Sequence, residues 1–373
     1  MACDYHLLPH SGIQTLSPYI PGKSVEQLAD ELGLTDIIKL ASNENPLGCS
    51  HKVTKALSAL SGHAIAMYPS PYHSPLLQNL SAKLGVPTDM ITLGNGTDML
   101  FPLIINCFAL HQEKQVLTHE YAFSSYAIYS KILGVPVTST PVDDQWAVDI
   151  KIMAKACDEK TAIIFLPNPN NPTGVPVKNR DIIYLLEHIP ESTFLVLDEA
   201  YVEYNSETPQ NDSIELLQHY SNLIITRTFS KAYGLAGLRL GYAIARAEVT
   251  SLLKKISPPF FVNCAALVAA NAALDDAQFI HETLTLNQQG LAQLKAGLKK
   301  LKLTCLPSSG NFITVDFKKD AGPLYQSLLR YGIIVRPLHP YRMDNFLRIT
   351  VGTMQQNIRF LDALEECLNE EKL

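Results

Sequence analysis

The residues best suited to chemistry lie between positions 228 and 242. Lys231 directly follows Ser230 and a strand-like run that ends at Arg227, and a glycine-rich segment leads from it to Arg239. A lysine amine presented in this way can attack a carbonyl and form a Schiff base, while hydroxyl and guanidinium groups can bind a phosphate. Most lysines are solvated surface residues, so this segment alone also fits an ordinary lysine after a strand.

Two further strand-like runs end in polar motifs. Asn168-Pro-Asn-Asn-Pro-Thr-Gly174 follows the first, and its composition is typical of a turn, although Asn171 could also direct its amide toward a ligand. Asp198 ends the second run, with Tyr201 three residues later. Asp198 could be a helix N-cap, or a buried carboxylate paired with a protonated ring nitrogen, with Tyr201 donating to a phenolic oxygen. The two interpretations are even until Lys231 is considered.

A glycine-rich turn, Gly94-Asn-Gly-Thr-Asp98, precedes the apolar helical segment Met99–Phe108. Free backbone N–H groups of Gly96, Thr97 and Asp98 at a helix N-terminus could bind an anion. Thr97 or Asp98 could instead be only an N-cap. The glycine pattern matches neither common nucleotide-binding motif, so it does not imply a nucleotide.

Aromatic and basic residues supply two more candidates. Phe123 follows a strand-like run, where an aromatic ring is usually part of the core but could also stack on a planar heterocycle. Arg336 and Arg348 lie in apolar, strand-like segments, where an isolated charge is costly to bury. They could pair with acidic side chains, or they could bind the carboxylate or phosphate of a substrate.

The elements that must position these candidates follow from the apolar pattern. Apolar and β-branched residues predict strands at Gln115–Leu117, Thr161–Pro167, Phe194–Leu197, Leu223–Thr226 and Tyr242–Ala245. Helical patterns lie between them, as at Lys178–His188 and Ser213–His219. Alternating strands and helices predict an α/β fold with a mainly parallel sheet, in which ligands bind at the carboxyl ends of the strands.

The C-terminal part predicts a smaller α+β domain. Its elements are a long helix, three short strands and a final amphipathic helix, at Ala277–Leu301, Asn311–Phe317, Ile333–Arg336, Phe346–Val351 and Gln355–Leu368. The N-terminal arm has one predicted helix, Ser24–Leu32, and is expected to pack on the small domain or on a second subunit. We therefore divide the chain into an arm at 1–45, a large domain at 46–275 and a small domain at 276–373.

Composition and charge narrow the class of protein. The 373 residues carry a formal net charge of −6 with a pI near 6.0, which argues against nucleic acid or an anionic membrane as the main partner. Seven scattered cysteines favour reduced thiols, and neither a metal-ligand spacing nor a serine-hydrolase motif occurs. The N-terminus lacks the features of a signal peptide and no apolar stretch is long enough to span a bilayer, so we expect a cytoplasmic protein.

Four motifs taken in chain order are far more specific than any one of them: Asn171-Pro-Thr-Gly, Asp198-x-x-Tyr201, Ser230-Lys231 and Arg239. This order closely resembles the fold-type I pyridoxal-phosphate aminotransferases, along nearly the whole chain. Within that family the sequence is most similar to the histidinol-phosphate aminotransferases. The narrower match is carried by Ser17-Pro-Tyr-Ile-Pro-Gly22, Ile38-Lys-Leu-Ala-Ser-Asn-Glu-Asn-Pro-Leu-Gly48, Tyr68-Pro69 and Leu347-Arg-Ile-Thr-Val-Gly-Thr353.

The resemblance implies roles for the candidates in the large domain, which would bind pyridoxal 5′-phosphate. Lys231 would hold the cofactor's aldehyde and carry a proton between the substrate Cα and the cofactor. Asp198 would keep the pyridine nitrogen protonated, so that the ring can withdraw electrons. Tyr201 and Asn171 would bond the phenolate oxygen, and Phe123 would stack on the ring.

The same resemblance implies a homodimer with composite sites. The cofactor phosphate would lie among Gly96, Thr97, Asp98, Ser230, Arg239 and, from the other subunit, Tyr68. Two segments depart from the family's usual forms, Tyr68-Pro-Ser-Pro71-Tyr and Tyr121-Ala-Phe123. Neither departure removes a required group.

The implied reaction is transamination between histidinol phosphate and 2-oxoglutarate, giving imidazole acetol phosphate and glutamate in histidine biosynthesis. Tyr19, Arg336 and Arg348 would bind the substrate phosphate, and the same arginines would bind the carboxylates of the second substrate. The alternatives are an aromatic amino acid aminotransferase, a threonine-phosphate decarboxylase-like enzyme and a non-catalytic, cofactor-binding regulator. The last would need a DNA-binding module, for which the chain has no room.

Overall fold

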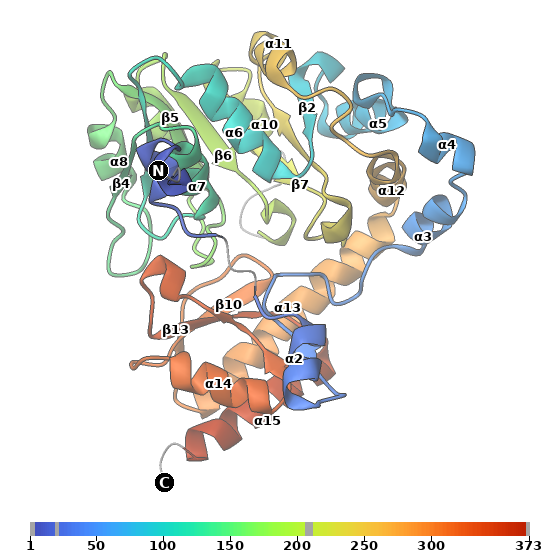
Figure 1. Cartoon of the computed structure of the whole chain (residues 1–373), viewed down its shortest axis with the longest axis vertical. Helices are drawn as coiled ribbons and strands as arrows, with labels where there is room; N and C mark the ends of the chain where they lie inside the picture. Colours follow the sequence, from blue (N-terminus) through green and yellow to red (C-terminus); the bar gives the residue numbers. More distant parts are fainter. Residues whose placement is uncertain (1–3, 19–21, 206–211, 371–373) are drawn as a thin grey trace.

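The computed structural model describes residues 4–18, 22–205 and 212–370. Figure 1 shows a larger part built around a sheet and a smaller part below it. The long helix α13 (Ala277–Lys300) runs from the larger part into the smaller one (Figure 1). None of the helices within these described ranges is both long and apolar enough to cross a membrane.

The larger part contains a seven-stranded sheet. In spatial order its strands are β2 (Ile91–Gly94), β8 (Gly241–Ile244), β7 (Leu223–Thr228), β6 (Phe194–Asp198), β5 (Thr161–Pro167), β3 (Gln115–His119) and β4 (Val137–Thr140). Strand β8 is antiparallel to both of its neighbours, and the other adjacent pairs are parallel. The predicted α/β fold with a mainly parallel sheet is therefore confirmed, with β2 and β4 as additional strands.

Both faces of this sheet are buried, because successive residues of the central strands pack into different cores. Ile164 and Leu197 belong to one apolar cluster, whereas their neighbours Ile163 and Val196 belong to the other. The first cluster includes side chains of α5 (Pro75–Leu84), α8 (Ile150–Ala156), α9 (Asn179–His188) and α12 (Cys264–Leu274). The second includes side chains of α6 (Thr97–Phe108), α7 (Ser125–Ile132) and α11 (Ala247–Ile256).

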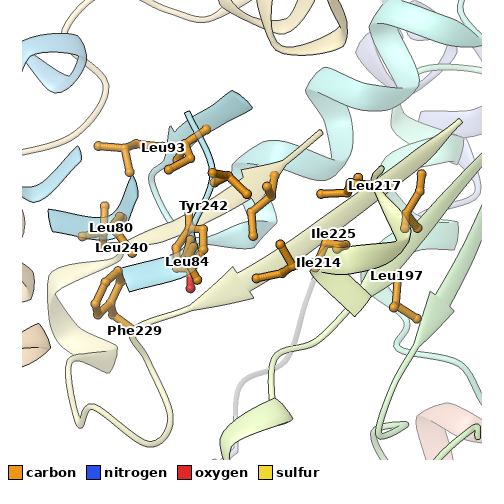
Figure 2. Close-up of a cluster of buried hydrophobic side chains, with 14 of the residues drawn as sticks. Leu80, Leu84, Leu93, Leu197, Ile214, Leu217, Ile225, Phe229, Leu240 and Tyr242 are labelled. Atoms are coloured by element: carbon orange, nitrogen blue, oxygen red, sulfur yellow. The ribbon is translucent and has the colours of Figure 1, made fainter. Parts of the chain in front are cut away.

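Figure 2 shows part of the first cluster, where Leu80 and Leu84 of α5 meet Leu93 and Tyr242 of the sheet. Phe229, which lies just after β7, closes the cluster beside Leu240. Each buried leucine of this kind contributes about 1.5–3 kcal/mol through its removal from water. This packing fixes the strand ends from which the polar candidates project.

The smaller part is a four-stranded antiparallel sheet with helices. Its strand order is β12 (Arg336–Pro337), β13 (Phe346–Thr350), β10 (Phe312–Asp316) and β9 (Thr304–Cys305), and its helices are α13, α14 (Gly322–Arg330) and α15 (Met354–Glu370). The prediction of one strand at Ile333–Arg336 is wrong. Residues 333–334 form β11 (Ile333–Ile334), which pairs with β1 (Ile38–Lys39), whereas Arg336 begins β12 and pairs with β13. The chain changes sheets at Val335, so the two halves satisfy their backbone groups with different partners.

The N-terminal segment contacts both parts of the molecule. Helix α1 (Ser11–Gln14) lies against α7, where His10 Nε2 is 2.9 Å from the carbonyl oxygen of Ile132. Helix α2 (Val25–Leu32) begins with a capping box at Ser24 and buries Leu28 in a cluster with residues of the smaller part. The prediction of a single helix in the arm is therefore wrong, since α1 is a second one.

The remaining helices are short. They are α3 (His51–Ser58), α4 (Gly62–Ala66), α10 (Asp212–Leu216) and the 3₁₀ turns η1 (Tyr5–Leu7), η2 (Pro71–His73), η3 (Thr88–Met90), η4 (Val202–Tyr204), η5 (Ala236–Leu238) and η6 (His339–Tyr341). A helix is predicted at Ser213–His219, but α10 ends at Leu216, three residues before the predicted end, because residues 217–219 form a turn.

Candidate active site

Three adjacent strands, β5, β6 and β7, bring the central candidates to one edge of the large sheet. Asp198 is the last residue of β6 and pairs with Pro167 of β5 and Thr226 of β7. Asn171 follows β5, and Lys231 follows β7. The carboxyl ends of parallel strands meet at the same edge, so the polar groups of all three loops face a common region.

Asp198 is a buried carboxylate with two side-chain donors. The Tyr126 hydroxyl donates to Oδ2 at 2.6 Å, and the Thr226 hydroxyl donates to Oδ1 at 2.8 Å. Burial raises the pKa of Asp198 to about 6, although both hydrogen bonds act to lower it. The N-cap interpretation is wrong, because the chain continues as a turn and Asp198 caps no helix.

Lys231 is partly buried and directed toward the N-terminal segment. Its Nζ donates to the carbonyl oxygen of Ser42 at 3.0 Å and lies 5.9 Å from the ring centroid of Tyr201. Desolvation, followed by the nearby guanidinium of Arg348, lowers the pKa of Lys231 to about 8. The interpretation of Lys231 as an ordinary solvated lysine is therefore wrong.

Tyr201 and Asn43 form a buried polar pair beside Lys231. The Asn43 amide donates to the Tyr201 hydroxyl oxygen at 2.8 Å, and Asn43 itself has a positive φ of 56°. The Thr350 hydroxyl donates to Asn43 Oδ1 at 3.2 Å, which ties the segment to β13. Burial raises the pKa of Tyr201 to about 12. Sequence reasoning placed Asn43 in a family motif but gave its side chain no role.

The glycine turn before α6 forms the second end of the site. Gly96 is the N-cap residue of α6, with φ 74° and no side-chain cap, so Thr97 and Asp98 lie inside the helix and neither is the N-cap. Arg239 Nη2 donates to Asp98 Oδ2 at 3.2 Å, and Arg239 Nη1 lies 3.5 Å from Ser230 Oγ. A cationic side chain and open backbone N–H groups therefore adjoin one helix N-terminus.

Arg336 and Arg348 face each other across the small-domain strands. They are direct partners in the β12–β13 register, which places their side chains on the same face of the sheet. The Arg348 guanidinium donates to Asn171 Oδ1, and its Nη2 donates to the carbonyl oxygen of Ala41 at 2.7 Å. Asn171 thus lies in a turn, as its composition indicates, and also joins the two parts of the molecule.

Near α7, the residues beside the site are held in place by contacts between aromatic rings. Phe123 is partly buried, and its ring meets Tyr126 edge to face at 5.7 Å between centroids. Tyr126 is fully buried and stacks on Phe165 at 4.6 Å with an interplanar angle of 3°. The sequence does not identify Tyr126 as a site residue, because it lies 72 positions from Asp198 and no local motif links the two.

The two remaining candidates are not placed beside Lys231 by this chain. Tyr68 is 80% exposed and stacks on Phe260, with 4.5 Å between ring centroids. Tyr19 lies outside the described residues. Within the described ranges, no group of three or more His, Cys, Asp or Glu side chains is arranged to hold a metal ion.

The donor set fits a phosphorylated pyridine aldehyde. It offers an amine of lowered pKa at Lys231, a buried carboxylate at Asp198, a phenol at Tyr201 and an anion-binding helix N-terminus with Arg239. These groups match the aldehyde, ring nitrogen, phenolic oxygen and phosphate of such a molecule. The sequence comparison decides the family. The model of the family described as aminotransferase class I and II matches residues 35–364.

The chain belongs to this family. It is 53% identical over 365 residues to histidinol-phosphate aminotransferase 2 of Legionella pneumophila strain Lens, covering 98% of this chain and 99% of that protein. The crystal structure of histidinol-phosphate aminotransferase from Sinorhizobium meliloti, in complex with pyridoxal 5′-phosphate, superposes with a TM-score of 0.88 at 27% identity and covers 98% of each chain. L-threonine-O-3-phosphate decarboxylase from Porphyromonas gingivalis superposes with a TM-score of 0.78 at 26% identity, covering 89% of this chain and 100% of that one. The chain is thus an aminotransferase of the fold-type I group.

Proposed function

We propose that this aminotransferase exchanges the amino group between histidinol phosphate and 2-oxoglutarate, giving imidazole acetol phosphate and glutamate. The observation that carries the substrate assignment is the cross-strand pair Arg336 and Arg348. Like charges placed directly opposite each other repel, so the pair is suited to an anion between them. A guanidinium can bind a phosphate or a carboxylate in a bidentate manner, and both substrates carry such a group.

Each end of the site would hold a different part of the cofactor. Gly96, Thr97 and Asp98 with Ser230 and Arg239 would bind the phosphate of pyridoxal 5′-phosphate. Asp198 would pair with the protonated ring nitrogen, and Phe123 would cover the ring. Tyr201 and Asn171 would donate hydrogen bonds to the phenolic oxygen. Asn171 can do so with its Nδ2 while its Oδ1 accepts from Arg348. Bound cofactor supplies an electron sink for the substrate Cα.

Lys231 would be the catalytic base. Its lowered pKa of about 8 leaves a useful fraction of the amine neutral near physiological pH, as a nucleophile and a proton acceptor require. The carbonyl of Ser42 orients the amine through the 3.0 Å hydrogen bond. The amine would take the proton from the substrate Cα and deliver it to the cofactor, so that the amino group can leave the substrate.

A second copy of the chain would complete the site. Four apolar side chains in α4, in the segment after it and in the turn before α12 are exposed by more than half: Ile65, Met67, Tyr68 and Phe260. Among them, Tyr68 stacks on Phe260. Such a patch is costly in water and suits a symmetric dimer interface. In that dimer Tyr68 would reach the cofactor phosphate of the partner's site, and Tyr19 would join the two arginines at the substrate phosphate. The enzyme would act in the cytoplasm, as a step of histidine biosynthesis.

A substrate panel tests the assignment. The loaded enzyme is assayed with histidinol phosphate, phenylalanine and O-phosphothreonine, with 2-oxoglutarate as the acceptor. We expect kcat/KM for histidinol phosphate to exceed that for phenylalanine by several orders of magnitude. A preference for phenylalanine would indicate an aromatic amino acid aminotransferase. Release of carbon dioxide from O-phosphothreonine would instead indicate the decarboxylase, whose phosphorylated substrate could use the same arginine pair.

A further inference from the structure

Tyr126 is a buried tyrosine that ends on the central carboxylate of the site. It lies in α7, and its hydroxyl donates to Asp198 Oδ2 at 2.6 Å. The residue is completely buried, so its hydroxyl cannot turn to water and must find its partner inside the protein. Hydrogen bonds from a hydroxyl to a carboxylate are shorter and stronger than neutral ones.

The direction of this hydroxyl is fixed by the packing of its ring. The Tyr126 ring stacks on Phe165 of β5 and meets the edge of Phe101 of α6 at 5.0 Å and 82°. These contacts come from a helix and a strand that are both buried in the second apolar cluster. The Thr226 hydroxyl, on β7, holds the other carboxylate oxygen. Asp198 is thus held from both sides by side chains of rigid elements.

We propose that Tyr126 is a positioning residue for the cofactor: together with Thr226 it fixes Asp198 and keeps that carboxylate ionised for the ring nitrogen. This proposal rests on the proposed function. An ionised carboxylate has about four acceptor positions, so two hydroxyl donors leave room for a pyridinium N–H. Donors stabilise the anion relative to the neutral acid. Without the Tyr126 hydroxyl, the proton shared with the ring nitrogen shifts toward Asp198, and the ring loses part of its positive charge.

The other surroundings of Asp198 oppose its ionised form. Asp98 of α6 and Glu199, the next residue after Asp198, both disfavour the Asp198 anion, as does its burial. Tyr201 also interacts with Asp198, and its pKa is raised to about 12, so it stays neutral. The hydroxyls of Tyr126 and Thr226 act in the opposite direction and favour the anion.

The first test uses the protein without cofactor. Tyr126→Phe keeps the ring and its stacking but removes the hydroxyl. We expect its urea midpoint to fall relative to wild type at pH 8, where Asp198 is ionised, and to approach the wild-type midpoint at pH 5, where Asp198 is protonated. Tyr331→Phe is the matched control, because the Tyr331 hydroxyl donates at 2.7 Å to the exposed carboxylate of Glu370, away from the site. An equal loss for Tyr126→Phe at both pH values would mean a packing role only and would overturn the proposal.

The second test measures the affinity for pyridoxal 5′-phosphate by fluorescence titration. Tyr126→Phe should weaken binding about tenfold to hundredfold, and Thr226→Val should act in the same direction. In the Asp198→Asn background, Tyr126→Phe should cause little further loss, because its effect passes through the carboxylate. An undiminished loss in that background would refute the positioning role. Thr226→Val serves the same two tests if Tyr126→Phe does not fold. A wild-type protein that binds no cofactor would instead refute the proposed function.

Discussion

At the scale of single residues, burial shifts the pKa values of Asp198 and Lys231 in opposite directions. Burial raises the pKa of Asp198 to about 6 and, with Arg348, lowers the pKa of Lys231 to about 8. Between these values the carboxylate is an anion while the amine is close to losing its proton. In the proposed function, the same desolvation would prepare Asp198 to hold a positive ring nitrogen and Lys231 to act as a base.

Replacing Lys231 tests this electrostatic arrangement. Lys231→Met should abolish transamination and should stabilise the cofactor-free protein at pH 7 by roughly 1–3 kcal/mol, because it removes a poorly solvated ammonium. The folded-state pKa of Lys231 is lowered, so the unfolded chain binds more protons and wild-type stability rises with pH above about 8. The gain from Lys231→Met should therefore shrink at high pH.

Urea unfolding of both proteins between pH 6 and pH 10 measures this difference. Lys254→Met is the control for activity: Lys254 lies in α11 outside the site, and burial lowers its pKa as well, so this variant should show a stability change of the same sign but keep its turnover. A pH-independent difference for Lys231→Met would contradict the lowered pKa. Retained turnover would contradict the catalytic assignment of Lys231.

At the scale of elements, the N-terminus of α6 depends on a glycine. A Cβ on Gly96 would lie 2.7 Å from Arg239 Nη2, and φ of 74° disfavours any other residue. Gly96→Ala should therefore lose about 1–3 kcal/mol of stability from backbone strain, because φ 74° and ψ 166° form a conformation that is essentially restricted to glycine. It should also weaken binding of pyridoxal 5′-phosphate, because Arg239 has to move.

Gly85→Ala separates these two effects. Gly85 ends α5 with a similar φ of 68°, and a Cβ there would meet no atom within 4 Å. Both variants should lose stability in thermal melts of the cofactor-free protein, and Gly96→Ala should lose more, because its ψ of 166° lies in a region that is essentially restricted to glycine whereas Gly85 is left-handed helical. Only Gly96→Ala should lose cofactor affinity. Equal cofactor affinities for the two variants would place the phosphate elsewhere.

From the pairing of Arg336 on β12 with Arg348 on β13, we expect both arginines to bind the substrate anion. Arg336→Ala should raise KM for histidinol phosphate about 10–100-fold, because it removes a charged hydrogen-bonding partner of the phosphate. Inorganic phosphate should also stabilise wild type more than Arg336→Ala in thermal melts. Arg330→Ala is the control, since Arg330 bonds Ser327 within α14. An unchanged KM would exclude Arg336 from the substrate site.

The sequence predicts the elements better than it predicts their partners. Runs such as Thr161–Pro167 are long, apolar and rich in β-branched residues, so their identity as buried strands follows from composition. The division at Val335 depends on pairing with β1, nearly 300 positions away, and no local pattern encodes it. Tyr126 and Asn43 reach Asp198 and Tyr201 across the fold for the same reason. The candidates that could be predicted are those placed at strand ends.

At the scale of the whole molecule, the exposed Tyr68 predicts an enzyme whose two sites share residues. Tyr68→Ala and Lys231→Ala should each lose most activity as purified proteins. If Tyr68 serves the partner's site, a mixed dimer has one site with both lesions and one with neither. Unfolding and refolding a one-to-one mixture should then restore about a quarter of wild-type activity, since half of the dimers are mixed and each has one intact site.

The alternative geometry gives a different result. If Tyr68 serves the site of its own subunit, every site in a mixed dimer carries one lesion, and mixing restores nothing. Lys231→Ala mixed with Asp198→Asn is the control, because both residues lie at the edge of one sheet in one chain and neither can complement the other. Recovery in the first mixture alone would establish the shared site. The exposure of Tyr68 and its stacking on Phe260 then have a single cause, a surface that is complete only when a second copy covers it.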